Sequence, residues 1–147
     1  LNRKWVGANP DALAKIAGLN IDASVEMLIA ETDANDPFVQ EEQMMPLLPI
    51  VRANDFGQGL SIAKQSEHGD KHSAMIHTMN VARMTEMGRA MDTTIFVKNG
   101  PCLAGLGLGG EGFISFSIAT TTGEGITTPR TFTRYRRCTL VNNLNIV

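Results

Sequence analysis

The sequence predicts an α/β fold built from βαβ units. From Pro46 onward, apolar runs that favour strands alternate with stretches in which apolar residues recur at helical spacing. Such alternation is typical of parallel strands joined by helical crossovers. The 147 residues are 43% hydrophobic and 19% charged, which is enough apolar material for one domain of ordinary size with a core. We therefore expect an ordered α/β chain.

The first forty residues predict one helix, one strand and a loop. Asn9, Pro10 and Asp11 precede an apolar stripe that ends at Gly18, a pattern of cap, first-turn proline and terminal glycine that indicates a helix over residues 10–17. The apolar run 25–31 is bounded by polar residues and favours a buried strand. Residues 33–37 (DANDP) are rich in turn formers and predict a loop.

The central part predicts strand, helix, strand, helix, strand. The expected strands are LPIVRA, HSAMIHT and TTIFVK, at residues 48–53, 72–78 and 93–98. Asn54 or Asp55 is expected to cap the first helix, which presents Phe56, Leu60 and Ala63 on one face. Asn80 is expected to cap the second helix, whose core-facing residues are Met84, Met87, Gly88 and Met91.

The chain changes character after Lys98. The glycine-rich stretch between Gly100 and Gly125 is expected to be loop, because glycine is costly in a regular helix. Residues 131–141 (TFTRYRRCTLV) favour an extended strand, and a solitary strand needs a sheet edge to pair with. Its arginines, Arg134, Arg136 and Arg137, fit either a solvated face or a subunit contact.

Charge and cysteine content exclude several classes of function. Thirteen Lys and Arg against fifteen Asp and Glu give a net charge of −2, so no broad basic field is available to attract nucleic acid. The most apolar run, residues 44–51, is much shorter than the roughly 20 residues that span a bilayer. Two cysteines provide no disulfide framework. We expect a cytoplasmic protein without nucleic-acid or membrane partners, and we interpret the start at Leu1 as that of a piece of a longer protein.

Two patterns invite a cofactor or metal interpretation. Residues 105–110 (GLGLGG) match G-x-G-x-x-G, but the dinucleotide fingerprint requires a helix at its end, and the strand-like FISFSIA follows; a close-packed turn is the alternative. His68, His72 and His77 suggest zinc, yet His72 and His77 are five apart on a strand and so face opposite sides. We therefore expect no metal site.

Three further residue types are candidates for a catalytic or binding role. His72 stands at the entry of a predicted strand, where an imidazole can transfer protons near neutral pH; the alternative is a structural histidine. One carboxylate of Glu41 and Glu42 could accept hydrogen bonds from a ribose, the alternative being a solvated loop. Parallel strands would place Glu42 and His72 at one edge, where they could share a cleft. Cys102 has no adjacent activating group.

Several strings taken together resemble one family. ETDANDPFVQEEQMMPLLPIVRA, HGDKHSAMIHT, IFVKNGPCLAGLGLGGEGF and TGEGITTPRTFTRYRRC are similar, in order, to the C-terminal third of the CoA-acylating aldehyde dehydrogenases of bacterial microcompartments. The resemblance implies that residues 1–117 form the C-terminal part of an aldehyde dehydrogenase catalytic domain. It implies that residues 118–147 form a return segment and an oligomerisation strand.

The resemblance also implies an activity for the longer protein. It would be an NAD-dependent oxidoreductase that converts a short aldehyde such as propionaldehyde, with coenzyme A, to acyl-CoA through a thioacyl-enzyme. The catalytic cysteine and a Rossmann domain would lie outside this chain, which alone would be inactive. The implied protein is a cytoplasmic homo-oligomer, with a bacterial microcompartment as a further implied location. A non-catalytic α/β assembly or binding module is the alternative.

Individual roles follow from the same resemblance. Glu42 would hold the nicotinamide ribose, although Met44 and Met45 replace the Phe and Gly that aldehyde dehydrogenases carry there. His72 would be catalytic, deprotonating the CoA thiol or orienting the thioester. Asn99, Pro101, Cys102 and Leu103 would line the substrate pocket, with Cys102 not acting as the nucleophile.

Overall fold

The computed structural model describes residues 2–110, 114–115, 126–139 and 141. The chain divides into two compact units, which are described separately. The first comprises residues 1–70 with 81–91, and the second comprises residues 71–80 with 92–147. The domain boundary expected between residues 117 and 118 falls outside the described residues. None of the helices within those residues combines the length and apolar character that crossing a membrane requires.

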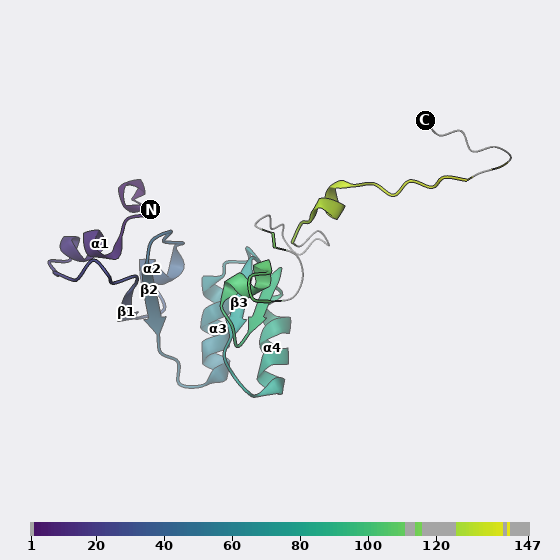
Figure 1. Ribbon diagram of the computed structural model, residues 1–147. Coiled ribbons are helices and arrows are strands. Elements are labelled where there is room, and N and C mark those ends of the chain that lie inside the picture. Colours follow the sequence, from purple (N-terminus) through teal and green to yellow (C-terminus); the bar gives the residue numbers. More distant parts are fainter. Residues whose placement is uncertain (1, 111–113, 116–125, 140, 142–147) are drawn as a thin grey trace. The chain divides into compact units, whose positions relative to one another are not determined.

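The first unit contains a two-stranded parallel sheet, visible beside α1 and α2 (Figure 1). Strand β1 (Leu28–Thr32) pairs with β2 (Leu47–Val51), with Leu28 opposite Leu47 and Thr32 opposite Val51. Helix α1 (Pro10–Ile16) has proline in its first turn and buries Ala14, so the helix expected at residues 10–17 is confirmed. A 3-10 turn, η1 (Arg3–Trp5), precedes it.

Strand β1 starts later, and is more exposed, than the sequence predicts. The Asp22 carboxylate accepts the backbone N–H of Ser24 at 2.9 Å, and the Val25 N–H bonds to the Asp22 carbonyl, so a turn occupies the expected beginning of the strand. Ile29 is 63% exposed because, among the described residues, β1 is bonded to one neighbouring strand only. The prediction of a buried strand over residues 25–31 is therefore wrong in both start and burial.

The loop expected at residues 33–37 leads into a short helix that the sequence analysis missed. Helix α2 (Pro37–Gln40) is capped by Asp36, whose carboxylate accepts the Phe38 N–H at 2.8 Å. The Thr32 hydroxyl donates to the other oxygen of that carboxylate at 2.7 Å. These two hydrogen bonds, the one from Thr32 above all, lower the pKa of Asp36.

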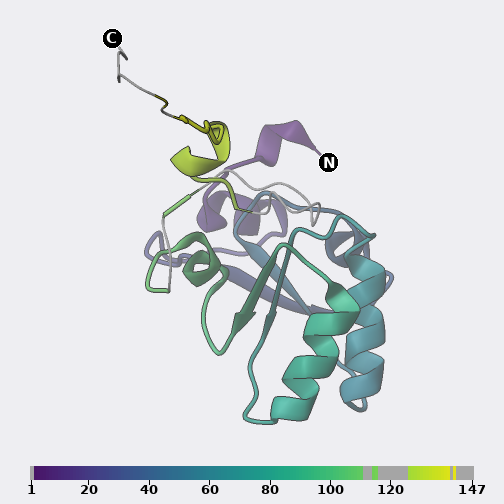
Figure 2. The same ribbon diagram turned by 90° about the vertical axis from the view of Figure 1, so that its right-hand side faces the viewer.

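Helices α3 (Phe56–Ser66) and α4 (Val81–Met91) lie side by side (Figure 1, Figure 2). Asp55 caps α3 by accepting the Gln58 N–H at 2.8 Å, as expected. The half-buried positions of α3 include Phe56, Leu60 and Ala63, and those of α4 recur at the expected spacing and end in buried Met91. The guanidinium of Arg83 lies 5.4 Å from the centre of the Phe56 ring, which adds a cation–π contact between the two helices.

The second unit is built on another parallel pair. Strand β3 (Ser73–Ile76) pairs with β4 (Ile95–Lys98), with Ser73 opposite Ile95 and Ile76 opposite Lys98. In chain order, α4 lies between these two paired strands. In β3 the buried residues are Ala74 and Ile76, whereas in β4 they are Ile95 and Val97. Because paired residues share a face and side chains alternate, both faces of this sheet carry buried apolar groups.

A short 3-10 helix, η2 (Cys102–Leu106), folds back onto one face of this sheet. It lies so close that a Cβ added at Gly105 would overlap the Cγ2 atom of Ile95 and would lie 3.1 Å from that of Val97. Only glycine fits at this position without displacing β4. Residues 100–110 thus form the expected loop, with one ordered helical turn inside it.

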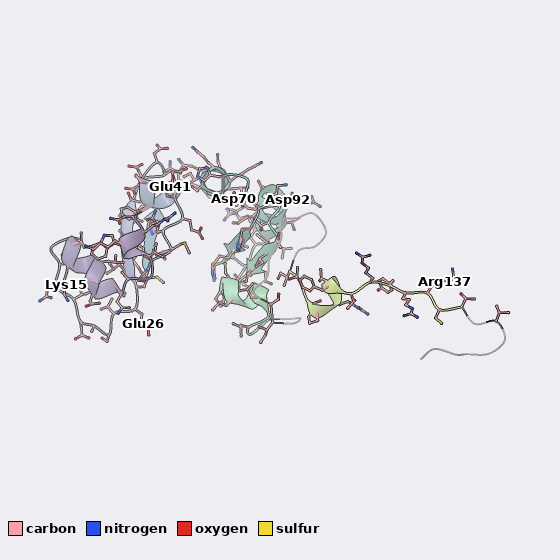
Figure 3. All side chains as sticks on the ribbon, turned by 90° about the horizontal axis from the view of Figure 1, so that it is seen from above. Lys15, Glu26, Glu41, Asp70, Asp92 and Arg137 are labelled. Atoms are coloured by element: carbon pink, nitrogen blue, oxygen red, sulfur yellow. The ribbon has the colours of Figure 1, made fainter. Side chains whose placement is uncertain are left out.

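The strand expected at residues 131–141 is not formed within the single chain. Its first residues belong to a 3-10 turn, η3 (Pro129–Phe132), and residues 133–139 have no regular structure. Tyr135 is 98% exposed, and Figure 3 shows Arg137 on an extended segment. A strand requires a hydrogen-bonding partner, so the expected pairing of this segment with another sheet edge stays a prediction.

The contact at Gly105 generates the first prediction. Gly105→Ala should destabilise the protein by about 1–3 kcal/mol, the range found for overpacked cores, because its methyl group would overlap Ile95. Urea denaturation of the purified protein measures this. Gly59→Ala in α3 is the matched control. Its Cβ would lie 3.5 Å from the Cβ of Ala53, an ordinary contact distance, and alanine favours a helix. A loss of stability in the control alone would contradict the packing argument.

Candidate functional site

Two adjacent carboxylates follow α2 in the first unit. Glu41 ends the helix, its N–H bonding to the Pro37 carbonyl at 3.0 Å, and its position is labelled in Figure 3. Glu42 follows in a segment without regular structure that leads to β2. Both residues are exposed, and the Glu42 carboxylate has no hydrogen-bond or ion-pair partner within the described part of the chain.

Neighbouring side chains fix the backbone on both sides of these carboxylates. The Gln43 amide donates to the carbonyls of Pro37 at 3.1 Å and Glu41 at 2.7 Å. The Gln40 amide donates to the Ala34 carbonyl at 2.6 Å, while the Gln40 carbonyl lies 2.9 Å from Nε2 of His68. An accessible carboxylate on a firmly held segment is suited to accept two hydroxyl hydrogen bonds from a ribose.

His72 lies at the amino-terminal end of the β3–β4 sheet. Its carbonyl accepts the Ile95 N–H at 3.0 Å, and its Nδ1 lies 2.5 Å from the Ser73 hydroxyl. Next to it, the Lys71 ammonium pairs with the Asp92 carboxylate at 2.6 Å, and the Thr94 N–H bonds to the Lys71 carbonyl at 2.9 Å. The backbone that carries this exposed imidazole is therefore anchored by two hydrogen bonds, from Thr94 and Ile95.

The expected pocket residues begin at the opposite, carboxyl-terminal end of the same sheet. Asn99 follows β4 with a left-handed backbone, at φ 53°, which asparagine tolerates better than most residues. Its side chain bonds to both backbone groups of Thr78, accepting the N–H at 2.8 Å and donating to the carbonyl at 2.9 Å. The whole carboxamide of Asn99 is thus engaged with the loop that follows β3.

From Asn99 the chain turns back across the sheet. Pro101 precedes η2, Cys102 is its first residue, and Leu103 is 51% exposed. Farther along η2, Gly105 rests on Ile95, the residue whose N–H bonds to His72. The pocket segment therefore starts at the edge opposite His72 and returns along the sheet toward the His72 end.

Cys102 lacks the surroundings of a reactive thiolate. It is half-buried, and burial raises the pKa of its thiol. The expectation that Cys102 lines a substrate pocket and is not the nucleophile stays a prediction. Cys138, by contrast, is exposed.

The glycine run 105–110 has the geometry of a close-packed turn. Gly105 lies inside η2, and Gly107 and Gly109 adopt left-handed conformations at φ 94° and 74°. The run overlaps the end of η2, and within residues 105–110 no helix begins whose N-terminus could hold a phosphate. The close-packed alternative is therefore the one that the geometry supports.

The structure brings some of the expected site residues together and leaves others in separate units. Asn99, Pro101, Cys102 and Leu103 form one turn in the second unit, which also contains His72. Glu42 belongs to the first unit, so the cleft that it was expected to share with His72 stays a prediction. The sequence analysis missed the contacts that hold these residues, namely those of Gln40, Gln43, Ser73 and Thr78. One sequence signal was available for the contact of Thr78, because NGP at residues 99–101 indicates a turn at Asn99.

Comparison with known proteins finds similarity over the whole chain. The chain is 48% identical over its full length to the acetylating acetaldehyde dehydrogenase of Salmonella typhimurium. It is 49% identical over 99% of its length to the CoA-propanoylating propanal dehydrogenase of the same organism. In each case it spans 32% of the relative's length. No protein-family model matches the chain.

Solved structures agree with these relatives. Rhodopseudomonas palustris propionaldehyde dehydrogenase, solved with bound CoA and an acylated cysteine, matches 93% of this chain with a TM-score of 0.86 and 44% identity. The propionaldehyde dehydrogenase of the Clostridium phytofermentans fucose utilisation bacterial microcompartment matches 98% with a TM-score of 0.88 and 44% identity. An engineered glycolyl-CoA reductase with bound NADP+ matches 93% with a TM-score of 0.86 and 43% identity. The chain covers 31%, 33% and 31% of these three chains, respectively.

The fold is that of part of an aldehyde dehydrogenase, with parallel strands joined by helices. More narrowly, the resemblance to the CoA-acylating branch is confirmed, because the relatives that match nearly the whole chain are named as enzymes of that branch. The chain corresponds to about a third of such an enzyme.

Proposed function

We propose that the protein to which these residues belong is an NAD-dependent, CoA-acylating aldehyde dehydrogenase. The reaction converts a short aldehyde, CoA and NAD+ to acyl-CoA, NADH and a proton through a thioacyl-enzyme. The nucleophilic cysteine and the Rossmann domain would belong to the two thirds of the relatives' length that this chain does not span. The observation that carries the proposal is the 48–49% identity, over essentially every residue, to acetylating and propanoylating dehydrogenases.

The geometry around Glu42 fits the proposed cofactor. NAD, when bound, supplies the hydride acceptor that takes the aldehyde to the oxidation level of a thioester. Glu42 would accept hydrogen bonds from the hydroxyls of the nicotinamide ribose. Its carboxylate is exposed and without a partner in the described residues, and Gln43 fixes its backbone, so the carboxylate would bind without first breaking a contact.

His72 would act in the second half of the reaction. An imidazole exchanges protons near neutral pH, and the anchored backbone and the Ser73 hydroxyl at 2.5 Å restrain the ring. His72 would take the proton of the CoA thiol, and the resulting thiolate would attack the thioester carbonyl and release the enzyme cysteine. Because the nucleophile is a thiol, no strong base for activating water is required.

The remaining roles concern the acyl group and the assembly. Pro101, Cys102 and Leu103 would line the pocket for the aldehyde, with Asn99 at its entrance. Residues 131–141 would form a strand on a neighbouring subunit of a homo-oligomer, consistent with the exposed side chains of Phe132 and Tyr135. A relative from a fucose utilisation microcompartment supports a cytoplasmic enzyme enclosed in such a compartment.

The intact protein should form NADH continuously from propionaldehyde and NAD+ only while CoA is supplied. Each enzyme molecule would form a single NADH without CoA, because the thioacyl group would remain attached. NADH absorbance in the presence and absence of CoA measures this. A folded intact protein that produces no NADH under either condition would instead support the non-catalytic module.

Replacing the proposed base should affect one half-reaction. His72→Ala should slow acyl transfer to CoA by about a hundredfold, the lower range for loss of general base catalysis, while the first burst of NADH keeps its rate. Rapid-mixing kinetics separates the two steps. His77→Ala, at the other end of β3, should leave both rates unchanged. Equal losses in both half-reactions of His72→Ala would exclude the proposed role.

Replacing the proposed ribose ligand should affect cofactor binding. Glu42→Gln should raise the KM for NAD+ about tenfold, because charge-assisted hydrogen bonds to the ribose would become neutral ones. The KM values for aldehyde and CoA should be unchanged. Glu41→Gln provides the matched control on the adjacent exposed carboxylate and should have no effect. An unaltered NAD+ response in Glu42→Gln would remove Glu42 from the cofactor site.

A further inference from the structure

The strongest unexplained feature of the second unit is the full use of the Asn99 carboxamide. Its Oδ1 accepts the Thr78 N–H at 2.8 Å and its Nδ2 donates to the Thr78 carbonyl at 2.9 Å. The Asn99 N–H also bonds to the Ile76 carbonyl at 2.8 Å. Together with a contact of Nδ2 to the Met79 Sδ at 3.9 Å, these hydrogen bonds tie the segment that leaves β4 to the segment that leaves β3.

The two tied segments lead to different parts of the unit. After β3 the chain runs through Thr78, whose hydroxyl accepts the Asn80 N–H at 3.1 Å, and through Met79, which is 89% exposed. After β4 it reverses at the left-handed backbone of Asn99 and enters η2 at Cys102. The carboxamide holds both segments at the carboxyl edge of the parallel strands, where ligands of α/β sheets commonly bind.

The reversal at Asn99 also determines where η2 lies. From this turn η2 runs back over β4 until Gly105 contacts Ile95, so one end of the pocket segment is fixed by packing at Gly105. The other end is held by the hydrogen bonds of Asn99 to Thr78. Cys102 and Leu103 lie between these two anchors.

We propose that Asn99 is a positioning residue for the pocket segment 101–103 and not a ligand of the substrate: its carboxamide binds Thr78 and thereby preforms the turn that carries Cys102 and Leu103. This inference rests on the proposed function in one respect, namely that the aldehyde is the group that segment 101–103 contacts. A preformed turn lowers the ordering cost of binding, so Asn99 acts on aldehyde affinity through Cys102 and Leu103.

Two substitutions test the role of the Asn99 carboxamide separately from that of its left-handed backbone conformation. Asn99→Gly keeps the left-handed φ without strain but removes both side-chain bonds. Asn99→Asp keeps an oxygen for the Thr78 N–H but replaces the donor to the Thr78 carbonyl with a charged acceptor, which that carbonyl repels. Asn35→Gly, at an exposed turn position of the first unit, is the matched control.

The first measurement requires no turnover. Iodoacetamide labelling of the intact protein, followed peptide by peptide by mass spectrometry, gives the ratio of the labelling rate of half-buried Cys102 in each variant to its rate in the unsubstituted protein. Asn99→Gly should raise this Cys102 ratio by about fivefold or more, as expected when hydrogen bonds that hold a segment are lost. Asn99→Asp should raise the ratio as well, and Asn35→Gly should not change it.

The second measurement uses steady-state kinetics. Asn99→Gly should raise the KM for propionaldehyde by a similar factor, with the KM values for NAD+ and CoA unchanged, and Asn99→Asp should also raise it. An unchanged Cys102 ratio in both variants would overturn the proposal. So would a parallel rise in all three KM values, which indicates general loss of structure. Absence of CoA-dependent NADH formation in the unsubstituted protein would instead remove the proposed function, and the labelling ratio would still decide whether Asn99 holds the turn.

Discussion

The close approach of η2 to β4 is the constraint on which the second unit depends. Glycine at position 105 allows the backbone of η2 to lie against Ile95 and Val97, and these two side chains are among the few that are buried in the described residues. Any larger residue would separate the turn from the strand. Because Ile95 also bonds to the backbone of His72, the same strand supports the pocket segment on its face and the proposed base at its end.

The elements that the sequence predicts well are those whose cause is local. The Asp55 cap and the half-buried Phe56, Leu60 and Ala63 of α3 follow from a hydrogen bond within one turn and from a period of 3.6 residues. The methionine face of α4 follows in the same way. Strand β1 could not be placed correctly because Asp22 forms a turn with Ser24, and such a turn competes with the extended conformation that the apolar residues favour.

The candidate site shows a similar division. The residue types at positions 42, 72 and 99 are visible in the sequence, and family resemblance suggests a role for each. What fixes them is long-range: Asn99 binds Thr78, 21 residues away, and His68 binds the Gln40 carbonyl, 28 residues away. No periodicity or motif in one sequence encodes such pairs. The difference matters for Asn99 above all, because resemblance suggests a pocket-lining residue whereas the hydrogen bonds engage its entire side-chain amide.

The C-terminal segment shows that strand propensity depends on the neighbouring groups against which the side chains pack. Residues 131–141 contain Thr, Phe, Tyr, Leu and Val, which are enriched in strands because they pack on a pleated, half-buried surface. Within this chain Tyr135 and Phe132 have no such surface and are 98% and 77% exposed. Burying these rings would contribute a favourable free energy that the exposed segment lacks. A sheet edge on another subunit would supply both the hydrogen bonds and the apolar contact, and Arg134, Arg136 and Arg137 would then flank a strand that forms only on assembly.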